Sequence, residues 1–161
     1  MEVERRYLIE YPDTGWLKAQ PHCEAVDILQ AYLRLDPEEE TRLRRRGADG
    51  NYIFFETVKR DLSSTQRLET ERRLSKEEFE ALLQAADHPL MLEKTRYCFM
   101  YENQYLEIDV YPFWDDKAIV EVEFCRELRD VKLPPELKVI REITEDPAYR
   151  NSALARKYSP A

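Results

Sequence analysis

Short stretches in which charged and apolar residues alternate recur along the chain. The first nine residues read MEVERRYLI and, if extended, place Glu2, Glu4 and Arg6 on one face, because successive side chains of a strand point to opposite sides. The same alternation predicts strands at 30–35, 41–46, 52–60, 67–73, 92–101, 105–111 and 117–126, and a last short strand at 139–144. The pattern therefore predicts about eight strands, mostly joined by hairpins, and most have one charged and one apolar face.

Helical periodicity is clearest over residues 75–87. Ser75 and Glu78 have the spacing of a capping box, and apolar residues follow at helical intervals, so the helix is expected to pack against the core. Residues 16–29 predict only short, weakly helical pieces. A short helix is expected to begin at Asp146 and Pro147, and turns are expected at 47–50 and 102–103.

The charged faces are sorted by sign along the chain. Cations come from three predicted strands and carboxylates from four others. The cations are Arg42, Arg44, Lys59, Lys94 and Arg96, and the carboxylates are Glu2, Glu4, Glu69, Glu71, Glu107, Asp109, Glu121 and Glu123. A plain sandwich would expose these faces to water, whereas a closed barrel would gather them around a polar lumen. The pattern alone leaves both arrangements open.

One pair of carboxylates is a candidate metal site. Glu121 and Glu123 are two residues apart on one strand face, so they lie about 7 Å apart and can share one or two cations. Ligation by carboxylates alone suits Mg²⁺ or Mn²⁺, and the chain has no cluster of His and Cys residues for zinc.

Composition excludes several classes of protein. The chain has 161 residues, 36% of them charged and 43% apolar, which predicts one globular domain over 1–161. The net charge of −8 argues against a nucleic-acid partner, and three glycines cannot build a P-loop or a GxGxxG motif. Three cysteines, no signal peptide and no long apolar run predict a cytoplasmic protein without a membrane span.

The charged pairs, taken together, have a recognisable order. The first is Glu2-Val-Glu4-Arg-Arg6, which matches an E-x-E-x-K motif except at its last position. The later matches are Arg42-Leu-Arg44, Lys59, Glu69-Thr-Glu71, Lys94-Thr-Arg96, Glu107-Ile-Asp109, Glu121-Val-Glu123 and the group Tyr149, Asn151 and Ser152. In these motifs and their order the chain resembles the CYTH domain family, also called the triphosphate tunnel metalloenzymes.

The resemblance implies a fold and a set of roles. The fold is α+β, an eight-stranded antiparallel closed β-barrel with a polar lumen and a few surface helices. The metal ligands would be Glu2, Glu4, Asp109, Glu121 and Glu123. The phosphate would be bound by Arg42, Arg44, Lys59, Lys94 and Arg96, with Glu69, Glu71 and Glu107 in secondary roles.

Arg6 stands where the family motif has a lysine. Arginine keeps the charge and binds phosphate through two nitrogens, but it does not readily release a proton. In some members the lysine works with a tyrosine, which Tyr32 matches here. The resemblance thus places Arg6 and Tyr32 with Glu2 and Glu4 among the catalytic candidates, while the arginine argues against specialisation for thiamine triphosphate.

The function implied is metal-dependent hydrolysis of a triphosphate, either inorganic tripolyphosphate or a nucleoside triphosphate. Two alternatives stay open: a class IV adenylyl cyclase that converts ATP to cyclic AMP, and a module that binds polyphosphate or a nucleotide without catalysis. The expected partner is a small-molecule triphosphate, and the protein is expected to be a monomer or a homodimer.

Overall fold

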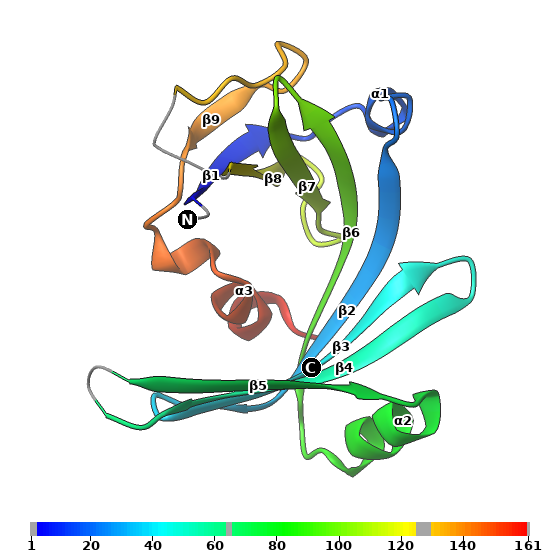
Figure 1. The fold of residues 1–161 in the computed structure, drawn as a ribbon, viewed down its shortest axis with the longest axis vertical. Helices are drawn as coiled ribbons and strands as arrows, with labels where there is room; N and C mark the ends of the chain where they lie inside the picture. Colours follow the sequence, from blue (N-terminus) through cyan, green and yellow to red (C-terminus); the bar gives the residue numbers. More distant parts are fainter. Residues whose placement is uncertain (1–2, 64–65, 125–129, 161) are drawn as a thin grey trace. The chain divides into compact units, whose positions relative to one another are not determined.

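The computed structural model describes residues 3–63, 66–124 and 130–160, and within them nine strands and three α-helices form (Figure 1). The strands are β1 (Val3–Glu10), β2 (Glu24–Leu35), β3 (Glu39–Ala48), β4 (Asn51–Asp61), β5 (Arg67–Leu74), β6 (Leu90–Tyr101), β7 (Gln104–Val110), β8 (Lys117–Phe124) and β9 (Val139–Glu142). The helices are α1 (Thr14–Lys18), α2 (Lys76–Ala85), the single 3₁₀ turn η1 (Pro147–Tyr149) and α3 (Asn151–Tyr158).

The predicted closed barrel of eight strands is wrong. The strands form one antiparallel sheet of nine, in the order β5-β4-β3-β2-β6-β7-β8-β1-β9. Closure requires the two outermost strands to pair, but no hydrogen-bonded pairing joins β5 to β9 among residues 3–63, 66–124 and 130–160. The short strand predicted at 139–144 forms as β9 and pairs with β1 on the side away from β8, so β1 is an inner strand. The sheet is open.

The chain divides into two compact units. Unit 1 contains residues 1–26 and 94–147, and unit 2 contains residues 27–93 and 148–161. Strands β2 and β6 each contribute residues to both units. The single domain over 1–161 stays a prediction.

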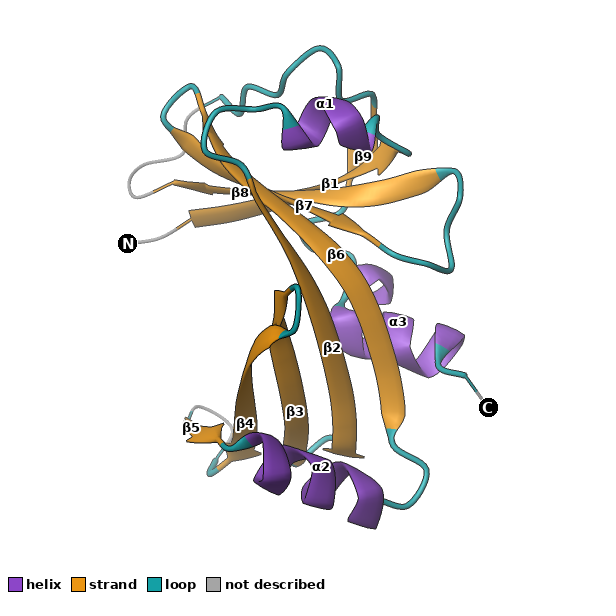
Figure 2. Cartoon of the chain, turned by 90° about the vertical axis from the view of Figure 1, so that its right-hand side faces the viewer, coloured by secondary structure: helices purple, strands orange, loops and turns teal. Residues whose placement is uncertain are grey.

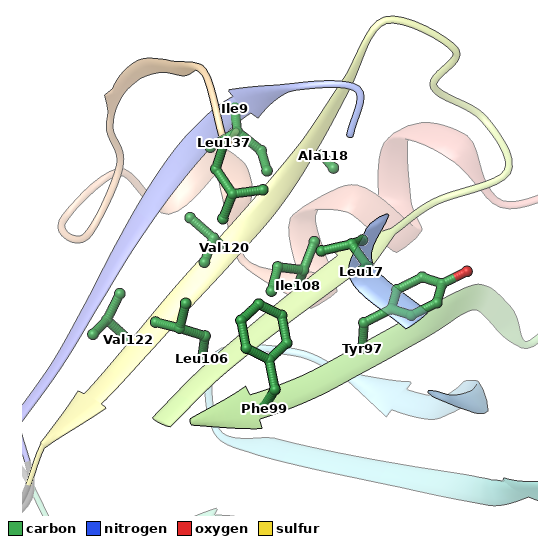
Figure 3. Close-up of a cluster of buried hydrophobic side chains, with 10 residues drawn as sticks. All are labelled: Ile9, Leu17, Tyr97, Phe99, Leu106, Ile108, Ala118, Val120, Val122 and Leu137. Carbon is green, nitrogen blue, oxygen red and sulfur yellow. The ribbon is translucent and has the colours of Figure 1, made fainter. Parts of the chain in front are cut away.

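Unit 1 buries the apolar faces of its strands (Figure 3). Tyr97 and Phe99 of β6 lie in one cluster with residues of the neighbouring strands and with Leu17 of α1, which is completely buried. The cluster is completed by Ile9, Leu106, Ile108, Ala118, Val120, Val122 and Leu137. Because strand side chains alternate, this packing directs the charged residues of β1, β6, β7 and β8 to the opposite face.

Unit 2 is built the same way, with α2 packed against β4 and β5 (Figure 2). Its buried apolar cluster contains Leu29, Ala31, Leu43, Phe54, Leu74 and Phe79. Phe79 of α2 packs on Phe54 of β4 with ring centroids 4.9 Å apart. The predicted capping box is confirmed, since Ser75 accepts a hydrogen bond from the Glu78 amide and Glu78 accepts one from the Ser75 amide. The apolar cluster leaves Arg42 and Arg44 on the other face of β3.

The strand predictions are confirmed apart from their ends, with one larger error. The weakly helical pieces predicted over 16–29 reduce to α1, and β2 begins at Glu24. From Asp27 onward β2 pairs with β3, and this pairing outweighs the weak local preference. In place of the helix predicted from Asp146, the 3₁₀ turn η1 forms first, Arg150 is extended, and α3 begins after it. No helix in the described part of the chain is both long and apolar enough to cross a membrane.

Candidate metal and anion site

Three carboxylates of unit 1 meet on the charged face of β1 and β8. The register of this antiparallel pair sets Glu4 opposite Glu123 and Arg6 opposite Glu121. One carboxylate oxygen from each of Glu4, Glu121 and Glu123 lies within 4.8 Å of the other two. Glu4 is exposed, and the other two are half-buried. We call these three residues the carboxylate cluster.

Like charges held this close disfavour ionisation. Burial, together with the neighbouring Glu4 and Glu107, raises the pKa of Glu121 to about 8, and Arg96 only partly offsets this. The guanidinium of Arg6 is 3.9 Å from Glu121 through its Nε atom, which is a loose ion pair. At neutral pH the protonated form of Glu121 is therefore favoured, so the three carboxyl groups are not all ionised when no cation is bound.

A buried network of ion pairs continues along the same face, on β7 and β6. Glu107 lies opposite Glu121 on β7 and accepts a hydrogen bond of 2.8 Å from Arg96 Nη1. Asp109 accepts hydrogen bonds from Arg96 Nε at 2.8 Å and Nη2 at 3.0 Å, and another of 2.8 Å from Lys94 Nζ. These four residues form what we call the ion-pair network.

The network changes the chemistry of Asp109. Burial alone would raise the pKa of Asp109, but Lys94 and Arg96 outweigh it and hold the pKa well below the usual range of an aspartate. Lys94 is almost completely buried, and its ammonium also lies 5.8 Å from the centroid of the Tyr111 ring. Two carboxylates and two cations thus balance one another beside the carboxylate cluster.

Unit 2 holds the basic candidates. The register of β2 and β3 sets Tyr32 opposite Arg42 and Gln30 opposite Arg44. Both arginines are half-buried, and the Nε atom of Arg42 is buried without a hydrogen-bond partner among the described residues. Burial raises the pKa of Tyr32 to about 12, against the opposing effect of Arg42 and Arg44, so the phenol is protonated at neutral pH.

The remaining predicted residues of unit 2 lie on β4 and β5. Lys59 is half-buried and lies opposite Glu69, while Thr57 lies opposite Glu71 and donates a hydrogen bond of 3.5 Å to it. Glu69 and Glu71 are exposed. Each carboxylate therefore lies across the strand pair from a group that it can orient: Glu69 from the ammonium of Lys59, and Glu71 from the hydroxyl of Thr57.

The predicted residues thus fall into two groups. Unit 1 brings together Glu4, Arg6, Glu121 and Glu123, and beside them Lys94, Arg96, Glu107 and Asp109. Unit 2 brings together Tyr32, Arg42 and Arg44, with Lys59, Glu69 and Glu71 on the next two strands. Glu2 lies outside the described residues.

Sequence reasoning missed two features of these groups. One is Gln30, a fully buried amide on the charged face of β2. Its signal was the spacing Gln30-Ala-Tyr32, which places both polar side chains on one strand face. The other is the pairing of Lys94 and Arg96 with Asp109 and Glu107, which depends on the register between β6 and β7.

The carboxylate cluster fits a divalent cation. Hard divalent cations take oxygen ligands, and the cluster offers three carboxylates with one oxygen from each within 4.8 Å of the other two. Burial and the neighbouring Glu4 raise the pKa of Glu121, and a bound cation would favour its ionised form.

The fold and these groups define an antiparallel β protein with clustered carboxylates and arginines on its charged faces. No protein-family model matches the chain. An inorganic triphosphatase of Nitrosomonas europaea is 34% identical over 158 residues, 96% of both chains. One of Acetivibrio thermocellus is 29% identical, covering 96% of this chain and 93% of the relative. A crystal structure of an inorganic triphosphatase matches with a TM-score of 0.70, at 31% identity, over 99% of this chain and 97% of that one.

The chain belongs to the CYTH family, the triphosphate tunnel metalloenzymes, as the order of its charged pairs predicted. The sheet described here nevertheless runs open from β5 to β9.

Proposed function

We propose that this protein hydrolyses inorganic tripolyphosphate in a reaction that depends on a divalent metal ion. The carboxylate cluster carries the proposal, because three carboxylate oxygens within 4.8 Å of one another are the kind of ligand set that a hard divalent cation prefers. Both sequence relatives reported above are named inorganic triphosphatase, which favours hydrolysis over the cyclase and the non-catalytic module. Mg²⁺ or Mn²⁺ is the expected ion, since the ligands are carboxylates alone.

In this proposal the unit 1 carboxylates have separate roles. Glu4, Glu121 and Glu123 hold the cation, with Glu2 as a further candidate ligand. A bound divalent cation would neutralise phosphate oxygens and make a coordinated water a better nucleophile. Asp109 was predicted as a ligand, but its hydrogen bonds to Lys94 and Arg96 favour a role in holding those two cations in place.

The cations act on the substrate. Tripolyphosphate carries several negative charges at neutral pH, and phosphoryl transfer asks the protein mainly for positioning and charge stabilisation. Arg42, Arg44 and Lys59 are proposed to bind phosphate oxygens. Arg6 is proposed to assist them by charge and by paired hydrogen bonds, because a guanidinium does not release its proton at neutral pH.

Tyr32 is proposed to donate a hydrogen bond to a phosphate oxygen. Its raised pKa keeps the phenol protonated, so it acts as a donor and not as a base. In the secondary roles, Glu107 fixes Arg96 from the side of the carboxylate cluster, and Glu69 and Glu71 orient Lys59 and Thr57.

The decisive experiment is release of phosphate from tripolyphosphate by Glu123→Gln. Glutamine keeps the shape of the side chain but removes a charged metal ligand, so turnover with Mg²⁺ or Mn²⁺ should fall by about 100-fold or more. Binding of tripolyphosphate should largely survive. Glu93→Gln is the matched control, because Glu93 is exposed on β6 and belongs to neither group. Wild-type turnover in Glu123→Gln would overturn the proposal.

Products and substrates complete the test. Tripolyphosphate, ATP and thiamine triphosphate are offered in turn with each metal, and the products are identified. Phosphate from tripolyphosphate supports the proposal, whereas cyclic AMP from ATP supports a cyclase. If the protein binds tripolyphosphate but does not hydrolyse it with either metal, the result would support a non-catalytic binding module.

A further inference from the structure

Gln30 is a polar side chain buried without any exposed surface, on the face of β2 that carries Tyr32. Burying an amide is unfavourable unless its hydrogen bonds are made. Its neighbours on this face are the Tyr32 hydroxyl, on its own strand, and the Arg44 guanidinium, directly opposite on β3. The buried amide therefore requires hydrogen-bond partners, and Tyr32 and Arg44 are within reach.

The orientation of the amide follows from its neighbours. With the oxygen toward Arg44, it accepts hydrogen bonds from Nε at 3.1 Å and from Nη2 at 2.6 Å, and the amide nitrogen donates to the Tyr32 hydroxyl at 3.0 Å. The reverse orientation would turn the amide NH₂ against N–H groups of Arg44, donor against donor. Only the first orientation satisfies all three groups.

This pairing restricts Arg44. A guanidinium is planar, and two hydrogen bonds to one oxygen fix both its position and the direction of its plane. Tyr32 anchors the other end of the amide, so Gln30 cannot rotate without breaking a bond. The phenol accepts this bond in its protonated form, which its raised pKa preserves at neutral pH.

We propose that Gln30 is a positioning residue that holds the Arg44 guanidinium, through a hydrogen-bonded chain anchored on Tyr32, in the orientation that binds a phosphoryl group. This inference rests on the proposed function, in which Arg44 binds the substrate. On this inference, part of the affinity for tripolyphosphate comes from Gln30, although Gln30 is neutral and buried. Gln30 itself need not touch the substrate.

The test is a double-mutant cycle measured as tripolyphosphate affinity of the metal-free protein by calorimetry. Gln30→Met keeps the length of the side chain and removes both polar ends, and it should weaken binding about tenfold, the worth of a hydrogen bond to a charged group. Arg44→Ala should weaken binding further. Adding Gln30→Met to Arg44→Ala should then cost almost nothing more, because Gln30 acts through Arg44. The ratio of kcat to KM should follow the affinity while kcat changes less.

Gln104→Met is the control, since Gln104 is also a buried glutamine, and it bonds to backbone groups of Tyr101 and Lys132. It should lower thermal stability but not the affinity. Gln30→Glu, of nearly unchanged shape, should also bind more weakly, because its charge neutralises Arg44. Should Gln30→Met fail to fold, wild-type affinity in Gln30→Glu would overturn the inference.

Two outcomes separate this inference from the proposed function. Unchanged affinity in folded Gln30→Met, or a full additive loss in the double variant, overturns the inference while hydrolysis by the wild type still stands. A wild-type protein that neither binds nor hydrolyses tripolyphosphate overturns both.

Discussion

Carboxylates on one face of unit 1 have opposite protonation behaviour because their neighbours differ. Glu121 has another carboxylate beside it, and its pKa rises to about 8. Asp109, buried on β7 of the same face, has two cations within hydrogen-bond distance, and its pKa falls. Residue type alone would assign both to the same metal site, but their contacts divide them: Glu121 belongs to the carboxylate cluster proposed to bind a cation, and Asp109 is an ion-pair partner of Lys94 and Arg96.

Asp109→Asn should therefore destabilise the protein. The substitution leaves Lys94 and Arg96 buried with one carboxylate, Glu107, between them. Loss of one partner from a buried ion pair typically costs about 3 kcal/mol or more. The unfolding free energy at pH 7, measured with urea, should fall by about this amount.

Asp61→Asn is the matched control, because Asp61 also pairs with an arginine, at 3.2 Å from Arg67, but at the surface. Solvent screens such a pair, so the same measurement should change little. An equal loss in both variants would contradict the role assigned to the buried network.

At the scale of elements, the secondary structure of some segments is encoded by neighbouring residues, and that of others is decided by pairing with another strand. The capping box of α2 is encoded within four residues, and the helix begins where those residues predict. Only the second half of β2 has a local signal, because alternation predicts a strand from Gln30 onward. The pairing with β3 begins earlier, at Asp27, and it extends the strand into a segment whose own sequence favours short helical pieces.

Ser75→Ala tests the local signal. The alanine cannot accept the hydrogen bond from the Glu78 amide, and loss of such a cap costs about 1 kcal/mol. The midpoint of thermal unfolding should fall accordingly. Ser152→Ala is the control, because Ser152 lies inside α3, whose N-cap Arg150 makes no side-chain capping hydrogen bond. A loss in Ser152→Ala as large as that in Ser75→Ala would contradict the capping argument.

At the scale of the whole molecule, pKa shifts predict how stability depends on pH. Arginine or backbone partners lower the pKa of several carboxylates: Asp36, Glu39, Glu78 and Glu142, as well as Asp109. Below their unfolded pKa of about 4, the unfolded chain binds more protons than the folded one. Their stabilisation is present above that pH and is lost as the pH falls through the folded values.

Glu121 has the opposite effect on how stability depends on pH. Its folded pKa of about 8 lies above that of the unfolded chain, so the folded protein binds the extra proton between about pH 4 and pH 8. This contribution is lost as the pH rises through 8. Without divalent cations, the unfolding free energy should therefore be greatest near pH 5 and decline on both sides.

Urea unfolding from pH 3 to pH 9 in the presence of a chelator checks this dependence. Glu121→Gln should remove the decline above pH 5 and leave the decline below it. A wild-type profile that stays flat from pH 5 to pH 9 would contradict the repulsion inferred within the carboxylate cluster.

The sequence by itself determined much of this protein. Alternation along the strands decides which residues share a face, because side chains of extended backbone alternate wherever the strand is placed. It therefore identified the charged faces and the strands that carry them. The capping box identified the helix α2, and the order of the charged pairs identified the family. The spacing of Glu121 and Glu123 was enough to place both in one site.

Only the tertiary structure decided which strands lie at the two edges of the sheet and which side chains of neighbouring strands lie opposite one another. Whether a sheet closes depends on its outermost strands, and β9 adds to β1 to leave the sheet open. The register between neighbouring strands decides which partner each cationic side chain bonds. It places Arg96 opposite Asp109, and Arg44 opposite Gln30. These contacts cross from one strand to the next, and the alternation of residues along a single strand does not encode the register between two strands.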